Sequence, residues 1–187
     1  MMKESWFRIT QDQRIADAIE PLHVKERIKP EWMRGELLHE LEQATLQFTI
    51  RPSRSPVAVD LIEQPYPLWS DDLKHVMQAF APKLLFRVTG LMDLERQKLY
   101  PYWFMVPPRI AALADGSEFD RSGRLRRLQV DGDRLNRTPW PVVQLTDQRL
   151  QETVLLVNLA LAEAILRREF IGLKLERVEL TTWELQR

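Results

Sequence analysis

The stretch that decides the fold lies near the C-terminus, where residues 154–178 read VLLVNLALAEAILRREFIGLKLERV. Its first four residues are all apolar, as in a short buried strand, and Asn158 follows in the position of a helix cap. The apolar run then predicts a helix from residue 159 to about residue 170. Gly172 can adopt the left-handed conformation that ends helices, and the alternating leucines after it predict a last strand.

The segments upstream of this stretch mix strands and helices without regular alternation. Ser70 is a good helix cap, and the apolar period after it predicts a helix that stops before Pro82. Residues 90–99 and 107–124 are rich in turn signals and predict loops or single turns. Short apolar or alternating runs predict strands at 45–50, 57–62, 83–88, 100–106, 125–130 and 142–145.

These elements predict an α+β fold: a mixed, largely antiparallel sheet with a few packed helices, ending in helix, glycine and strand. Residues 1–44 are expected to form an N-terminal helical extension, because helix start signals occur at Asp12 and at Pro30. Residues 45–187 are expected to form the α+β core domain, as one compact unit.

Composition places the chain among ordinary folded proteins, with 44% hydrophobic and 29% charged residues. The formal net charge of +0 removes a broad electrostatic attraction to nucleic acid or to an anionic membrane. The chain has no cysteine, hence no disulfide and no thiolate site. The N-terminal residues lack the apolar core of a signal peptide, and the longest apolar stretch is too short to span a bilayer. We therefore expect a cytoplasmic protein without a membrane or nucleic-acid partner.

A search for catalytic motifs finds none of the common ones. The three histidines, His23, His39 and His75, are far apart in sequence and lack the spacing of a metal site. No serine lies in a Gly-x-Ser-x-Gly motif, and the six glycines are scattered singly rather than in a phosphate-binding loop. We accordingly expect no metal, no cofactor and no enzymatic activity.

Two observations keep other activities open. Asp60, Asp71, Asp72 and Asp93 lie near expected strand ends and helix starts, where two carboxylates could line a cleft and perform acid–base chemistry. Residues 121–127 (RSGRLRR) contain four arginines, which could bind phosphate. Arginines beside one strand of a neutral protein are more often solvated or paired with nearby acids, such as Asp131 and Asp133.

Aromatic residues are the remaining signal. Several of the six tryptophans lie beside prolines or in turns, where an exposed ring would suit a binding surface, although filling the edges of a modest core is the better explanation for them, given the large area that each ring buries. The candidate partner-binding residues are Trp69, Asp71 and Asp72 at one corner, with Tyr102 and Trp103. The tryptophans are Trp6, Trp32, Trp69, Trp103, Trp140 and Trp183.

Two segments resemble a family of bacterial immunity proteins that accompany polymorphic toxins. The first is residues 161–178, LAEAILRREFIGLKLERV, which resembles the family's helix, Gly-Leu and final strand. The second is Asp60 followed by a short loop, the Ser70 cap and the helix of residues 73–80; the aromatic strand at 100–106 also has a counterpart. The likeness covers roughly residues 45–180.

The resemblance implies a cytoplasmic protein that binds and neutralises a cognate toxin domain. It implies no reaction mechanism and no catalytic residue. Two alternatives stay open from the residues themselves: a small enzyme that uses carboxylates, and a structural or assembly protein of a phage or secretion system.

Overall fold

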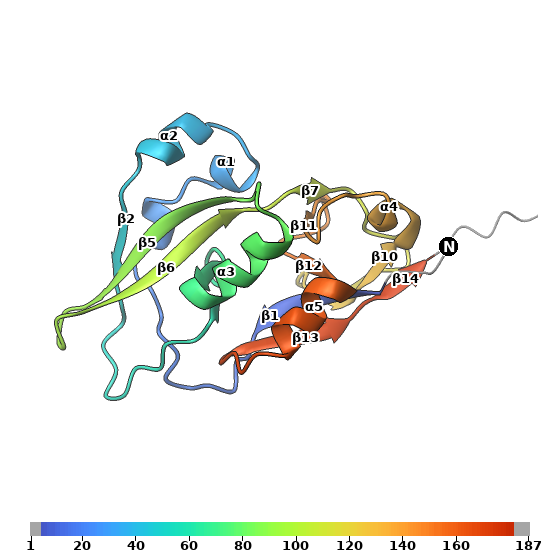
Figure 1. The fold of residues 1–187 in the computed structure, drawn as a ribbon. Coiled ribbons are helices and arrows are strands. Elements are labelled where there is room, and N and C mark those ends of the chain that lie inside the picture. Colours follow the sequence, from blue (N-terminus) through green and yellow to red (C-terminus); the bar gives the residue numbers. More distant parts are fainter. Residues whose placement is uncertain (1–4, 182–187) are drawn as a thin grey trace, which may run out of the picture. The chain divides into compact units, whose positions relative to one another are not determined.

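The computed structural model describes residues 5–181 and has the expected class of fold (Figure 1). Helices account for 20% and strands for 36% of the described residues, in mixed and mostly antiparallel sheets. The predicted α+β class is therefore confirmed.

The chain divides into two compact units, and each is assembled from separate segments. Unit 1 contains residues 5–9, Pro108–Glu163 and the segment from Leu175 onward, whereas unit 2 contains Thr10–Pro107 and Ala164–Lys174. This division does not coincide with the expected boundary at residue 44. The reason is that residues 6–9 pair with a strand of unit 1, while the chain from Thr10 onward belongs to unit 2.

The main sheet of unit 1 has the strand order β13-β1-β12-β11-β7. Strand β12 corresponds to the predicted apolar strand and pairs antiparallel with both β1 and β11, while β7 runs parallel to β11. Its core includes Trp6, Val143 and Leu156. The strands are β1 (Trp6–Gln11), β7 (Arg109–Ile110), β11 (Val142–Leu145), β12 (Leu155–Asn158) and β13 (Leu173–Arg177).

Smaller elements complete unit 1. Strands β8 (Glu118–Phe119) and β9 (Leu125–Arg127) form a hairpin that carries the arginine-rich segment. Strand β10 (Gln129–Asp131) pairs in parallel with β14 (Glu179–Thr181), and helix α4 (Gly132–Asn136) follows β10 directly.

Helix α5 (Leu159–Leu166) begins where the sequence predicts. The side-chain Oδ1 of Asn158 accepts a hydrogen bond from the backbone N–H of Leu161 at 3.0 Å, as expected of a cap. The helix ends at Leu166 rather than near residue 170, and Gly172 lies in the loop between α5 and β13. The predicted order of helix, glycine and strand is present, but the glycine does not itself end the helix.

Unit 2 is built around a second sheet with the strand order β2-β5-β6-β4-β3. The hairpin of β5 and β6 is paired from Leu85↔Val106 to Asp93↔Lys98, so both strands run further than the sequence indicated. Strand β2 is parallel to β5 and the other pairs are antiparallel. The strands are β2 (Leu46–Thr49), β3 (Leu61–Ile62), β4 (Leu68–Ser70), β5 (Leu85–Asp93) and β6 (Lys98–Val106).

One face of this second sheet is covered by the residues before β2. Trp32 and Leu41 pack there with Phe48, Tyr102 and Phe104. The covering segments are η1 (Val24–Glu26), α1 (Pro30–Met33) and α2 (Leu38–Gln43), and the helix expected to start at Asp12 does not form. Pro21 and Ala18 instead make bridges to the chain around residues 50 and 57. The extended backbone there pairs with backbone groups of that segment, and a helix would leave those partner groups unpaired.

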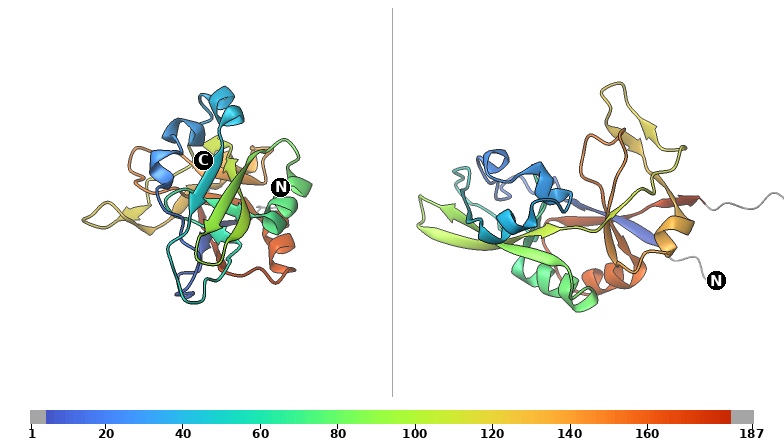
Figure 2. Two further views of the ribbon diagram at one scale, coloured as in Figure 1. Left: turned by 90° about the vertical axis from the view of Figure 1, so that its left-hand side faces the viewer. Right: turned by 90° about the horizontal axis from the view of Figure 1, so that it is seen from above.

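Helix α3 (Asp71–Phe80) covers part of the opposite face (Figure 1). Its buried residues Leu73, Val76 and Met77 face the sheet, and the helix contacts β4 and β6. The β5–β6 hairpin extends past the helix, as the right-hand view of Figure 2 shows.

We expect Gly172→Ala to lower the free energy of unfolding by about 2–4 kcal/mol. Gly172 has φ 77°, and a Cβ placed there would lie 2.4 Å from Cγ1 of Val59. Gly35 is the matched control, because it has φ 75° but no atom within 4 Å of an added Cβ. Gly35→Ala should therefore cost only the backbone strain, about 1–2 kcal/mol. Urea denaturation measures both variants, and equal losses would contradict the predicted crowding.

Candidate functional site

Asp60 connects three segments of unit 2. Its carboxylate accepts hydrogen bonds from the Ser70 hydroxyl and, at 2.6 Å, from the backbone N–H of Ile171. Its backbone N–H also donates to the carbonyl of Ile171 at 2.7 Å, and its carbonyl accepts from the N–H of Ser70 at 2.9 Å. One residue thus holds the end of β4 and the loop before β13 together.

Ser70 relays this connection into helix α3. Its Oγ accepts a hydrogen bond from the N–H of Leu73 at 3.2 Å, which confirms the predicted cap. Asp71 and Asp72 occupy the first turn, where their charge favours the positive end of the helix dipole. The segments that carry the sequence resemblance, around Asp60, Ser70 and Gly172, therefore meet in space.

A cavity of about 670 Å³ lies between α3 and the loop at residues 168–171. Its polar lining includes Asp60, Asp72 and His75, and Phe80 and Ile171 are exposed apolar residues beside them. The remaining lining residues are Ala58, Val76, Ala79, Arg168, Glu169 and Phe170.

The predicted binding corner divides into a buried and an exposed part. Trp69 and Tyr102 are buried, and the Tyr102 hydroxyl donates to the carbonyl of Val59 at 2.6 Å, so both belong to the core of unit 2. Burial raises the pKa of Tyr102 above its ordinary range. Asp71 and Trp103 come together, because the indole N–H of Trp103 donates to Oδ1 of Asp71 at 2.8 Å. Asp72 is exposed and lines the cavity instead.

An open apolar surface continues from Trp103 across the hairpin. The pairs Val88↔Trp103, Gly90↔Pro101 and Met92↔Leu99 lie on the face of the sheet that also carries Trp69. Helix α3 covers Trp69, but Val88 and Leu99 keep 50% and 53% of their surface exposed. We call Val88, Leu99, Pro101 and Trp103 the open face. Sequence reasoning missed Val88 and Leu99, although apolar residues at consecutive positions of β6 were a signal that both sides of that strand are apolar.

The half-buried ring of Trp103 is held in place by α3. The ammonium of Lys74 lies 4.2 Å from the centre of the ring, in a cation–π contact. Together with the hydrogen bond to Asp71, this contact fixes an aromatic side chain at the border of the open face.

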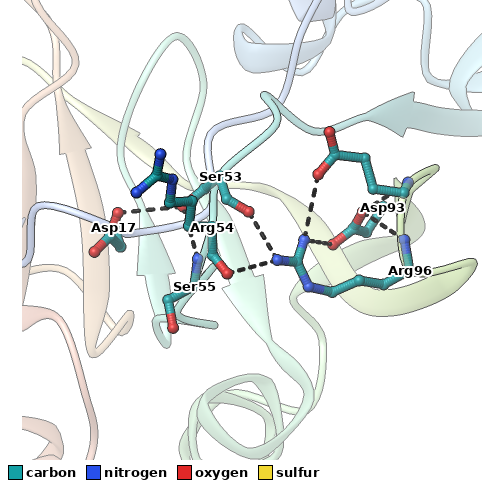
Figure 3. Close-up of polar contacts among 7 residues, drawn as sticks. Asp17, Ser53, Arg54, Ser55, Asp93 and Arg96 are labelled. Atoms are coloured by element: carbon teal, nitrogen blue, oxygen red, sulfur yellow. Dashed lines mark hydrogen bonds and ion pairs between the residues drawn. The ribbon is translucent and has the colours of Figure 1, made fainter.

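Of the four candidate carboxylates, Asp60 and Asp72 line this cavity, whereas Asp71 and Asp93 are not in its lining. Asp93 lies at the turn of the β5–β6 hairpin, where it is 2% exposed and forms an ion pair with Arg96 at 3.0 Å (Figure 3). The guanidinium of Arg96 also donates to the carbonyls of Ser53 and Arg54, at 2.9 and 2.7 Å. Asp93 therefore holds Arg96 in the position from which Arg96 anchors the loop around residue 53 to the hairpin.

Hydrogen bonding controls the charge of Asp93. Burial acts to raise its pKa, but hydrogen bonds from the backbone N–H and guanidinium of Arg96 outweigh burial, so the pKa of Asp93 lies below its ordinary value. The attachment of the loop depends on the ionised carboxylate of Asp93, because this carboxylate forms the ion pair with Arg96.

The other candidate residues neither line the cavity nor belong to the open face. Trp6 and Trp32 are buried in the two cores, Trp140 is half-buried, and Trp183 lies outside the described residues. The arginine-rich segment pairs with acids other than the two expected: Arg127 contacts Glu118 and Glu179, and Arg126 contacts Asp120. Within residues 5–181, no cluster of three or more histidine or acidic side chains could hold a metal ion.

No family model matches the chain, and a search of the curated proteins finds no match to its sequence. Over the same described range, no helix is long and apolar enough to cross a membrane.

We expect Asp60→Asn to lower the free energy of unfolding by about 1–3 kcal/mol, because an amide cannot accept both hydrogen bonds in the same geometry. Ser70→Ala should cost about 1 kcal/mol through the lost cap. Since the two side chains share one hydrogen bond, the double variant should lose less than the sum of the two single losses. Chemical denaturation of the four proteins measures the coupling, and strict additivity would show that the bond is not formed.

The stabilisation by Asp93 should depend on pH. Because its folded-state pKa is lowered, its contribution is present above the ordinary pKa of aspartate, about 3.9, and is lost as the pH falls through the lowered value. Urea unfolding from about pH 6 to about pH 2 should show wild type converging toward Asp93→Asn at the acid end. Arg96→Gln should reproduce the smaller pH dependence of Asp93→Asn. A constant difference between wild type and Asp93→Asn across this range would contradict the prediction.

Proposed function

We propose that this chain is a protein-interaction module, an immunity protein that binds and neutralises a cognate bacterial toxin domain in the cytoplasm. The observation that carries the proposal is the open face, a contiguous apolar surface beside a fixed tryptophan. The sequence resemblance over roughly residues 45–180 supports the assignment to toxin binding.

The open face has the composition of a protein-binding surface. Contiguous exposed apolar residues are uncommon on proteins that act alone, and aromatic anchors dominate the binding energy of interfaces. Val88 and Leu99 flank Trp103 and Pro101 on one side of the hairpin. Lys74 and Asp71 contact the tryptophan, so a polar rim lies beside the apolar centre, as in typical interfaces.

Pro101 favours contact through side chains over addition of a strand. Strand β4 pairs with residues 102–104 of β6, so residues 98–101 of β6 are not paired with β4. Proline has no N–H, and it therefore removes one donor that an added strand would use. A partner should lie on the side chains of this face.

A carboxylate-dependent enzyme is the second candidate, because Asp60, Asp72 and His75 line one cavity. The two carboxylate oxygens of Asp60 already accept hydrogen bonds from Ser70 and Ile171, which argues for a structural role. Stoichiometry separates the two functions: a binding protein protects only when it equals the toxin in amount, whereas an enzyme protects at far lower amounts.

The test begins with a pull-down of the tagged chain from its native host, followed by identification of the retained protein and by growth rescue in cells that express it. We expect the variant with Val88→Asp and Leu99→Asp to bind that partner at least about 100-fold more weakly, because two apolar contacts are lost and charges are buried. Calorimetry measures the affinity, and the variant should no longer restore growth.

Leu159→Asp is the matched control. Leu159 is 39% exposed at the start of α5 in unit 1, where an acid is compatible with the helix N-terminus. This variant should bind as wild type does. Wild-type affinity in the Val88 and Leu99 variant would remove the open face as the interface, and failure of the wild-type chain to bind or protect would overturn the proposed function.

A further inference from the structure

The cavity beside α3 carries negative charge that the protein itself does not neutralise. Among the described residues, neither Asp72 nor Glu169 has a hydrogen bond or ion pair from its side chain, and both line the cavity. Arg168 is the only basic residue in the lining apart from His75, and its Nη1 donates to the carbonyl of Ala164 in α5 at 3.3 Å. The two acids are thus available to a cation from outside.

The neutral form of the His75 imidazole adds an acceptor. Its Nδ1 lies 2.7 Å from the carbonyl oxygen of Asp71, which can only accept, so Nδ1 must carry the proton. In the neutral ring, Nε2 then has a free lone pair. The polar lining therefore offers acceptors from Asp72, His75 and Glu169.

The apolar part of the lining suits a hydrocarbon chain. Phe80 and Ile171 are 42% and 51% exposed, and Val76 and Ala79 line the cavity beside them. Lysine and arginine combine a hydrocarbon stem with a charged end, and they pack the stem on apolar surface while the charge meets an acceptor. This combination of surfaces matches such a side chain better than a small inorganic cation.

We infer that the cavity receives a lysine or arginine side chain of the protein partner. This inference rests on the proposed function and extends it, because it gives the partner a basic residue next to the segment that contacts the open face. Helix α3 borders both sites: Asp71 and Lys74 contact Trp103, while Asp72 and His75 line the cavity. One partner could therefore engage both sides of the helix.

The first test uses charge-removing variants and the partner recovered by pull-down. Asp72→Asn and Glu169→Gln should each weaken binding by about 10-fold to 100-fold, the effect of losing a hydrogen bond to a charged group. Glu42→Gln is the control, because Glu42 is an exposed acid of α2 outside the cavity, and it should leave the affinity unchanged. Calorimetry measures Kd, and thermal unfolding verifies that the variants fold.

The second test locates the partner residue directly. Phe80→p-benzoylphenylalanine places a photo-cross-linker at the rim of the cavity in an aromatic position. The cross-linked partner peptide should contain a lysine or arginine, and changing that residue to glutamine should reproduce the loss seen with Asp72→Asn.

The outcomes separate the two claims. Full affinity in both acid variants, or a cross-linked peptide without a basic residue, overturns the inference while the binding function stands. A wild-type chain that binds no partner contradicts the proposed function and this inference with it.

Discussion

The carboxylate of Asp60 is the interaction on which unit 2 depends. It accepts from the Ser70 hydroxyl, which in turn accepts from the N–H of Leu73, so the start of α3 is tied into a short chain of hydrogen bonds. Its second oxygen accepts from Ile171, which is 111 residues away in sequence. Hydrogen bonds in such a chain polarise and strengthen one another. The position of α3 therefore follows from one half-buried junction.

That position decides which part of the sheet is covered. Helix α3 covers Trp69 and reaches as far as Trp103, and beyond it the side chains of Val88 and Leu99 are exposed to solvent. The same helix forms one wall of the cavity, and the loop held by Asp60 forms the other. A structural interaction thus creates both surfaces to which we assign binding.

Local signals in the sequence predicted local structure well. The caps at Ser70 and Asn158, the strand at 154–157 and the α+β class are confirmed, because each depends on residues within a few positions of one another. Long-range pairing could not be predicted. Helix α5 stops at Leu166 although the pattern continues, because the next residues must bring Ile171 to Asp60.

The candidate site was predicted only in part, for a related reason. Adjacent residues of β6 point to opposite faces, and Tyr102 and Trp103 look alike in sequence while one is buried and the other borders the open face. Their different exposure depends on how far helix α3 covers the face that carries Trp103. Similarly, no local pattern shows that Asp72 and Glu169 line one cavity.

The division of the chain into interleaved units has a consequence for how this protein can vary. Elements β1, α5 and β13 each contain residues of both units, and unit 1 is interrupted by the whole of Thr10–Pro107. No single cut in the chain yields a complete copy of either unit. Recombination that exchanges one contiguous fragment would therefore break both cores, so new binding specificities should arise by point substitution on the exposed surfaces rather than by exchange of modules.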